Sequence, residues 1–291
     1  MTLQDTIFTI FGSDKRITDK RMAGGGDINE SFIVTLSDGE RIFVKENRNV
    51  PSDFFAAEEA GLRALKGTDT IPTASVIASG KDGSVSFLIL EYISSGRRSS
   101  RFFEDFGHNL AALHAADTSL FTPGGAFGFT MDNYIGATAQ KNKVASSFIE
   151  FYRESRLEPQ FKMAWSYFDD RYRAKADSLL SRLDSFLIEP AHPSLLHGDL
   201  WGGNYMTDQD GNAMLIDPAV YVGHPEADVA MTELFGGFDL RFYQAYKEAA
   251  PFAPGYADRR DLYNLYHLLN HLNLFGPSYL GSVTRILDRY C

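Results

Sequence analysis

The chain has 291 residues, which is enough for one large domain or for two lobes with a substantial core. Its formal net charge of −10 at pH 7 argues against a nucleic-acid or anionic-membrane partner, since both usually require a basic patch, and no stretch approaches the roughly 20 apolar residues of a membrane span. The single cysteine, Cys291, excludes an intrachain disulfide and a multi-cysteine metal site, and the N-terminus lacks a signal-peptide pattern, so we expect a cytoplasmic protein.

Residues 1–93 read as a strand-rich, nucleotide-binding lobe. After a short helix over 2–11, alternating apolar residues separated by turn residues predict strands at 16–22, 31–36 and 41–45. The tight spacing of these three segments predicts an antiparallel meander.

A glycine cluster and a strand lysine suggest phosphate binding in this lobe. Gly24, Gly25, Gly26 and Asp27 lie between the first two strands, and glycines let backbone N–H groups approach phosphate oxygens closely. Lys45 ends the third strand, where kinases place a lysine that holds the nucleotide phosphates. The plainer alternatives are a flexible hairpin turn and an exposed strand lysine.

The helix expected from about 53 to 65 supplies a partner for that lysine. Glu58 is four residues from both Phe54 and Leu62, so it lies on the apolar face of the helix, whereas Glu59 is turned about 100° away. A carboxylate on an apolar face needs a partner, and we expect Glu58 rather than Glu59 to pair with Lys45.

The last strand of this lobe, expected at 85–92, ends in a possible hinge. Leu90, Glu91 and Tyr92 close an apolar strand that we expect at the edge of the sheet, and Ser94-Ser95-Gly96 follows. Backbone groups at such a hinge could hold adenine. An ordinary buried strand and loop is the alternative.

From 94 to 291 the pattern is mostly helical. We expect helices from about 99 to 114, over much of 147–187, and near 241–249, 258–275 and 278–290, with Trp165 and its aromatic neighbours packed in the core. A long loop over 118–145 interrupts them, and such loops are usually functional or mobile.

The stretch from Leu196 to Asp217 carries the chemistry. Asp199 and Asn204 are five residues apart, and a hairpin turning at Asp210-Gly211 would bring Asp217 beside Asn204. In phosphoryl transfer, an Asp takes the proton of the acceptor hydroxyl, and an Asn and a second Asp hold Mg²⁺ through oxygen atoms. A solvated, Asp-rich turn is the alternative.

Asp228 has two possible roles. It could cap the helix that begins near it, or it could hold the backbone of the catalytic loop, as an Asp does at this place in kinase folds.

These segments together resemble the fructosamine kinase (ketosamine kinase, protein-ribulosamine 3-kinase) family of the protein-kinase-like superfamily. The resemblance is carried by HGDLWGGN and IDPAVYVGHPEADVAMTELFGGF, and it extends to GGGDIN, FVKEN, EEAGLRAL, ESRLEPQF and FGFTMDNYIGATAQKN. It implies an α+β, two-lobed kinase-like fold with an antiparallel-sheet lobe over 1–93 and a helical lobe over 94–291. Gly202 stands where the family usually has serine, which removes a hydroxyl near the loop.

The resemblance also implies a role for each candidate residue. Asp199 would be the base, Asn204 and Asp217 would hold Mg²⁺, and Lys45 with Glu58 would hold the phosphates of ATP. Gly24 to Asp27 would cover those phosphates, Leu90 to Tyr92 would take adenine, and Trp201 would form a wall of the acceptor pocket or simply pack. The implied reaction phosphorylates O3 of a ketosamine, on a small amine or a glycated protein, and leads to deglycation.

Two other readings remain open from the sequence. The same fold could phosphorylate an aminoglycoside, choline or a similar molecule, or the chain could be a nucleotide-binding scaffold without catalysis. A protein kinase switched by activation-loop phosphorylation is disfavoured, because Gly198 precedes Asp199 where such kinases have Arg, and no A-P-E motif follows.

Overall fold

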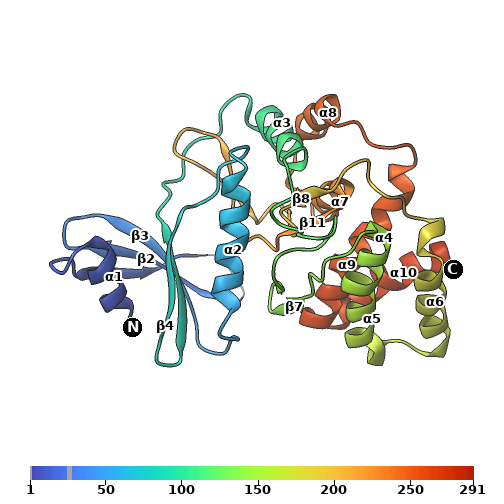
Figure 1. The fold of residues 1–291 in the computed structure, drawn as a ribbon, viewed down its shortest axis with the longest axis horizontal. Coiled ribbons are helices and arrows are strands. Elements are labelled where there is room, and N and C mark those ends of the chain that lie inside the picture. Colours follow the sequence, from blue (N-terminus) through green and yellow to red (C-terminus); the bar gives the residue numbers. More distant parts are fainter. Residues whose placement is uncertain (1, 25–27) are drawn as a thin grey trace.

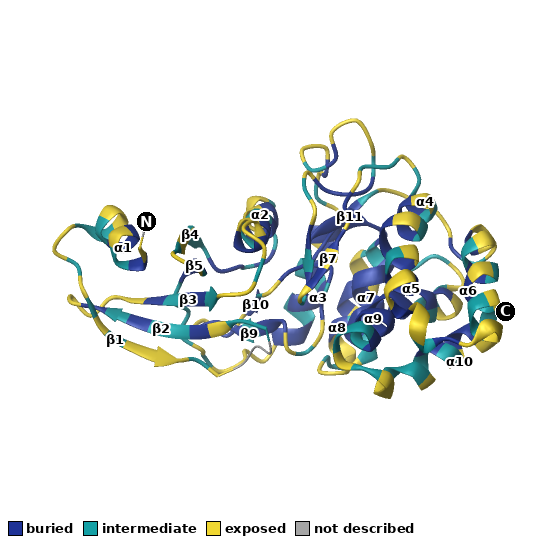
Figure 2. Cartoon of the chain, turned by 90° about the horizontal axis from the view of Figure 1, so that it is seen from below, coloured by how far each residue is buried: buried dark blue, intermediate teal, exposed yellow. Residues whose placement is uncertain are grey.

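The computed structural model describes residues 2–24 and 28–291, which form two lobes (Figure 1). The first lobe is an antiparallel sheet flanked by two helices, and the second is mostly helical, as the fold class predicted. Helix α2 (Phe54–Gly67) lies between the sheet and the helical lobe in both views (Figures 1 and 2).

The sheet of the first lobe has the strand order β1-β2-β3-β5-β4, and every neighbouring pair is antiparallel. The first three strands form the predicted meander. The prediction of an edge position for the hinge strand β5 was wrong, because β4 pairs with its outer side. The sequence alone did not reveal this order, because α2 separates β3 from β4 along the chain and local patterns do not show which strand pairs with β3. The strands are β1 (Ile17–Met22), β2 (Glu30–Leu36), β3 (Arg41–Asn47), β4 (Val76–Asp82) and β5 (Val85–Glu91).

The two faces of the sheet are covered by different helices because side chains alternate along each strand. Phe87 and Ile89 of β5 join a core with Ile7 of α1 (Leu3–Phe11). Leu88 and Leu90, which alternate with Phe87 and Ile89 and point to the opposite face, join a core with residues of α2. The α2 helix is therefore fixed on one face of the nucleotide lobe, with Glu58 directed toward β3.

The second lobe is built around the central helix α9, most of whose residues are buried (Figure 2). The prediction that Trp165 packs in the core was wrong, because 36% of it is exposed, although its neighbour Phe168 is buried. The α-helices of this lobe are α3 (Phe102–His114), α4 (Phe148–Tyr152), α5 (Glu158–Ala164), α6 (Asp170–Ser181), α7 (Pro225–Leu234), α8 (Leu240–Ala249), α9 (Tyr256–Phe275) and α10 (Leu280–Tyr290), with a π-helical segment at Arg153–Leu157 and short 3-10 turns at Trp165–Tyr167, Leu183–Ser185 and Pro277–Tyr279.

The remaining described strands form three two-stranded antiparallel pairs. The segment expected as a long loop over 118–145 contains one of them, and Gly128 also bridges to Val222. None of the helices within the described residues is long and apolar enough to cross a membrane. The pairs are β6 (Asn133–Ile135) with β7 (Thr138–Gln140), β8 (Ser194–Leu196) with β11 (Tyr221–Gly223), and β9 (Tyr205–Thr207) with β10 (Ala213–Leu215).

Candidate active site

The loop that carries Asp199 begins at the end of β8 and is held by Asp228. The Asp228 carboxylate accepts hydrogen bonds from the backbone N–H groups of His197 (2.7 Å) and Gly198 (2.9 Å). Helix α7 begins at Pro225 with His224 as its N-cap, so Asp228 does not cap the helix. Of the two roles considered for Asp228, the structure shows the one that fixes the loop.

Two residues of this loop, Gly198 and His197, fix the path of its backbone. Gly198 has φ of +83°, and a Cβ there would come within 2.0 Å of the carbonyl oxygen of Ala219, so only glycine fits. The buried His197 ring lies 2.9 Å from the carbonyl oxygen of Ile216, next to Asp217. Burial lowers the pKa of His197, so the ring stays neutral and donates to that carbonyl. The loop and the strand that leads to Asp217 are thereby tied together.

Asp199 and Asn204 contact each other directly. The Asn204 Nδ2 donates to both the main-chain oxygen (2.7 Å) and the carboxylate Oδ2 (3.1 Å) of Asp199. Burial raises the pKa of Asp199 to about 7, and the nearby charges of Asp217 and Asp228 act in the same direction, against the hydrogen bond from Asn204. A carboxylate with a pKa near neutrality is suited to accept and release a proton at physiological pH.

Asp217 pairs with Lys45 of the other lobe, which also pairs with Glu58. The Oδ1 of Asp217 lies 2.5 Å from Lys45 Nζ, which also lies 2.5 Å from Glu58 Oε1. Glu59 instead pairs with Arg63, so the structure pairs Lys45 with the glutamate that the helical periodicity selected. Asp217 has φ of +53°, a conformation that costs a non-glycine residue about 1 kcal/mol or more and that clusters at functional sites.

The Lys45 cluster carries an excess of negative charge. Burial would lower the pKa of Lys45, but the attraction of Asp217 and Glu58 outweighs it, so the pKa is raised and the ammonium stays charged. Burial raises the pKa of Glu58, while Lys45 opposes that shift. One cation thus faces two carboxylates, an arrangement that favours the arrival of a further cation.

The residues present fit a magnesium ion. The Asn204 amide nitrogen is used by Asp199, which leaves its oxygen as the ligand atom, and Lys45 occupies one of the two Asp217 oxygens. Both donors are therefore oxygens, as Mg²⁺ prefers. Within residues 2–24 and 28–291, no group of three or more His, Cys, Asp or Glu side chains could hold a metal ion by itself.

The other residues predicted to bind the nucleotide are the glycine cluster and the hinge at Leu90 to Tyr92. Gly25, Gly26 and Asp27 lie outside the described residues, and Gly24 is exposed. Leu90 is buried in the core beside α2, and the Glu91 N–H already donates to the carbonyl oxygen of Ser75 (3.0 Å). That N–H is therefore not free to bind adenine.

Trp201 is partly exposed rather than buried in the core. It is 39% exposed, and its ring meets Phe235 edge-on at 6.3 Å. Gly202 packs against the next turn of that segment, because a Cβ there would come within 3.1 Å of the Gly236 carbonyl oxygen. A serine at 202 would push on this turn and hence on the residue that supports the tryptophan.

The sequence did not point to His267, which lies close to Asp199. Its Nδ1 is 3.8 Å from Asp199 Oδ1 and has no hydrogen-bond partner among the described residues. Burial lowers the pKa of His267 to about 3, so it is neutral beside Asp199. Helix α9 brings it there across the whole lobe, and no local spacing links the two residues.

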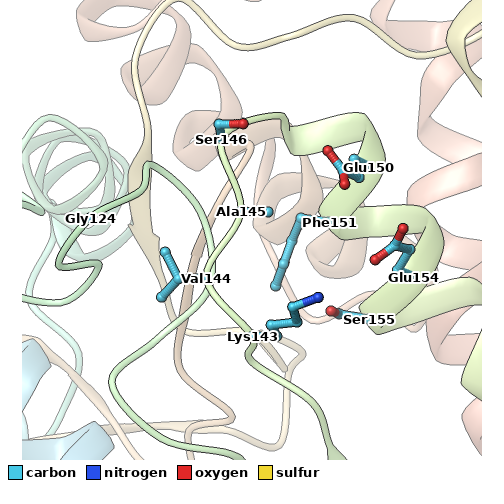
Figure 3. A pocket seen from close by; sticks show the side chains of 9 residues that line it. All are labelled: Gly124, Lys143, Val144, Ala145, Ser146, Glu150, Phe151, Glu154 and Ser155. Atoms are coloured by element: carbon cyan, nitrogen blue, oxygen red, sulfur yellow. The ribbon is translucent and has the colours of Figure 1, made fainter.

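A polar hollow elsewhere in the helical lobe does not belong to this site. It has a volume of about 310 Å³ and is lined by Lys143, Glu150, Glu154 and neighbouring residues (Figure 3). None of the predicted site residues lines it. The predicted site residues Asp199, Lys45 and Glu58 instead lie on the loop after β8, on β3 and on α2.

The fold and this cluster define a kinase-like phosphotransferase. A solved aminoglycoside phosphotransferase, APH(4)-Ia, is similar to this chain in fold, with a TM-score of 0.64 at 17% identity over 99% of this chain and 96% of the other. At that identity the likeness concerns the fold alone.

The family follows from closer comparisons. The fructosamine kinase family model matches residues 1–291, and the chain belongs to that family. It is 39% identical to a "Probable ketoamine kinase" of Synechocystis over 99% of this chain and 95% of the relative, and 39% identical to the chloroplastic protein-ribulosamine 3-kinase of Arabidopsis thaliana over 96% and 84%. A solved candidate fructosamine-3-kinase from Haemophilus somnus superimposes with a TM-score of 0.87 at 27% identity, covering 99% and 96%. The chain is accordingly an ATP-dependent kinase that acts on a hydroxyl group.

Proposed function

We propose that this kinase transfers the γ-phosphoryl group of ATP to the sugar 3-hydroxyl of a ketosamine. Ketosamine phosphorylation is the activity of the family to which the chain belongs. The observation that supports it in this molecule is the convergence of Asp199, Asn204, Asp217, Lys45 and Glu58 from two lobes. An aminoglycoside or choline acceptor and a non-catalytic scaffold are not favoured.

Asp199 acts as the base in this proposal. Its carboxylate takes the proton of the acceptor hydroxyl as the oxygen attacks the γ-phosphorus, and the bond from that phosphorus to the bridging oxygen of ADP breaks. The Asn204 hydrogen bond orients the carboxylate, and the raised pKa of Asp199 supports proton acceptance near neutral pH. No covalent bond to the protein is needed.

Lys45, oriented by Glu58, holds the phosphates of ATP, while Gly24 to Asp27 cover them. The Leu90 to Tyr92 hinge takes the adenine through backbone groups other than the Glu91 N–H, which already donates to Ser75. When bound, Mg²⁺ would neutralise the developing charge on the phosphoryl oxygens, and Asn204 and Asp217 would hold it. These residues serve phosphoryl transfer by positioning and charge, as such reactions require.

The acceptor lies beside Trp201. The exposed ring of Trp201 would form one wall for the sugar and its amine. After phosphorylation at O3, loss of the phosphate together with the sugar frees the amine, which is deglycation.

We place the boundary between the two lobes between residues 93 and 94, and we expect the protein in the cytoplasm.

The position of phosphorylation provides the test. The purified protein is incubated with Mg²⁺, ATP and a ribulosamine or fructosamine, and the product is examined by ³¹P NMR. We expect a phosphate ester on C3 and, with time, the free amine. A stable ester at another carbon would contradict the proposed regiochemistry, and no ester with either sugar would contradict the proposed acceptor class.

A further inference from the structure

The β6–β7 hairpin, from Asn133 to Gln140, has no role in the function described above. It lies in the segment between α3 and α4, at the side of the helical lobe that faces α2 (Figure 1). Asn133 is opposite Gln140 in its register, and Tyr134 is opposite Ala139. Because successive strand residues alternate in direction, Asn133 and Gln140 share one face and Tyr134 lies on the other.

The inner face of this hairpin holds the backbone just after Asp217. Asn133 Nδ2 donates to the carbonyl oxygen of Val220 (2.7 Å), and Gln140 Nε2 donates to that of Ala219 (2.9 Å). Gln140 also donates to Asn133 (2.8 Å) and accepts from the Tyr266 hydroxyl (2.6 Å). Both amides are almost fully buried, so leaving any of their hydrogen bonds unmade would cost free energy.

The outer face of the hairpin holds the start of α2. The Tyr134 hydroxyl donates to Asp53 Oδ1 (2.8 Å), and its ring lies 4.8 Å from the ring of Phe54. Glu58 lies on the next turn of the same helix. Further along α2, Gly61 has no side chain and therefore lets the helix approach Val220 closely. A Cβ added at Gly61 would lie 3.1 Å from Cγ2 of Val220.

The tip of the hairpin reaches a third element. Gly136 has φ of +62°, and a Cβ there would come within 3.0 Å of Ile28, which leads into β2, and within 3.2 Å of Leu274 on α9. One short hairpin therefore touches α2, the segment after Asp217 and the entry to β2.

We propose that the β6–β7 hairpin is an interlobe strut that keeps Lys45, Glu58 and Asp217 assembled. Tyr134 positions α2, and Asn133 and Gln140 position the segment that holds Asp217 in its left-handed conformation. A kinase with such a strut needs no phosphorylated activation loop to bring its helix glutamate to its lysine. The inference rests on the nucleotide-binding roles proposed for these residues, and not on the identity of the acceptor.

Two variants of Tyr134 test the contact with α2. Tyr134→Phe removes the hydrogen bond to Asp53 and keeps the ring, and Tyr134→Ala removes both. We expect Tyr134→Ala to weaken binding of Mg²⁺ and a non-hydrolysable ATP analogue, measured by calorimetry, by roughly tenfold, and Tyr134→Phe to weaken it by about threefold. KM for the acceptor should stay within about twofold of the wild-type value in both variants, since the hairpin acts through nucleotide-binding groups.

A double-mutant cycle separates positioning from general destabilisation. If Tyr134 acts through Glu58, then Tyr134→Ala should cost little more once Glu58→Gln is present. Full additivity of the two losses would overturn the proposal, as would nucleotide affinity unchanged in Tyr134→Ala. Because calorimetry needs no acceptor, this result is independent of whether ketosamines are the substrates.

A buried polar residue away from the hairpin provides the control for the inner face. Gln140→Ala should weaken nucleotide binding, whereas Thr232→Ala, which removes a buried hydroxyl of α7 bonded to Val229 and Tyr243, should lower thermal stability without that loss. Equal effects of the two variants on nucleotide affinity at matched stability would show that Gln140 acts only as a core residue.

Discussion

Asp228→Asn should damage the catalytic loop more than the fold. In the wild-type chain the Asp228 carboxylate accepts from His197 N–H, Gly198 N–H and His114 Nε2, the last at 3.3 Å. Burial alone would raise the pKa of Asp228, but His114 and these donors lower it, so the carboxylate is charged. Asparagine keeps the size of the side chain and replaces one acceptor oxygen with an amide donor.

The magnitude follows from the donors left without an acceptor. Whichever way the amide is turned, at least one buried N–H group that contacted Asp228 meets another donor, at a cost of about 1–3 kcal/mol, and the others lose a charged acceptor. We therefore expect a loss of about 3 kcal/mol in the free energy of unfolding. Because Asp199 is the next residue after Gly198, we also expect kcat to fall by roughly 100-fold, the effect of a displacement of about 1 Å.

Urea unfolding and steady-state kinetics measure the two effects on the same preparation. Glu226→Gln is the matched control, because Glu226 is a buried carboxylate of the same helix that pairs with Arg259 (2.6 Å) and does not touch the loop. It should lower stability with kcat within about threefold of the wild type. A folded Asp228→Asn enzyme with wild-type kcat would refute the view that Asp228 positions the base.

Three further outcomes follow from the site. Asp199→Ala should lower kcat by at least about 100-fold and leave ATP affinity by calorimetry nearly unchanged, whereas near-normal turnover would show that the base is another group. Asp217→Ala should instead weaken Mg-ATP binding, and an unchanged affinity would count against its metal role. Burial lowers the pKa of His224 from 6.5 to about 3, so its contribution to stability is present above pH 6.5 and is lost, at about 1.4 kcal/mol per pH unit, as pH falls toward 3. His224→Asn, which retains an N-cap acceptor, should flatten the stability–pH curve over that range in urea titrations, and an unaltered slope would contradict the buried neutral imidazole.

Local patterns were enough to predict the elements that depend on neighbours in the chain. The Asp-Gly turn predicts the β9–β10 hairpin, which places Asn204 beside Ile216, the residue before Asp217, because hairpin geometry follows from the turn and strand residues. Helical periodicity separated Glu58 from Glu59 for the same reason: it reports which face of the helix is buried.

Features that depend on distant packing could not be predicted in this way. The interior position of β5, between β3 and β4, depends on which of β4 and β5 pairs with β3, and an apolar strand pattern fits either place. His267 reaches Asp199 only through the packing of α9, and the Asn133 and Gln140 amides were hidden in a segment that reads as a loop. An amide at each end of the segment 133–140, which a turn at Gly136 would place opposite each other, is the signal that could have revealed that network.

The central claim is acceptor-dependent phosphoryl transfer, and ATP consumption measures it most directly. The purified protein is assayed with Mg²⁺ and ATP in the presence of a ribulosamine, a fructosamine, an aminoglycoside or no acceptor. The site and the family predict turnover with a ketosamine that is well above the blank and that Asp199→Ala removes. Turnover with the aminoglycoside alone, or ketosamine turnover that survives in Asp199→Ala, would contradict the account.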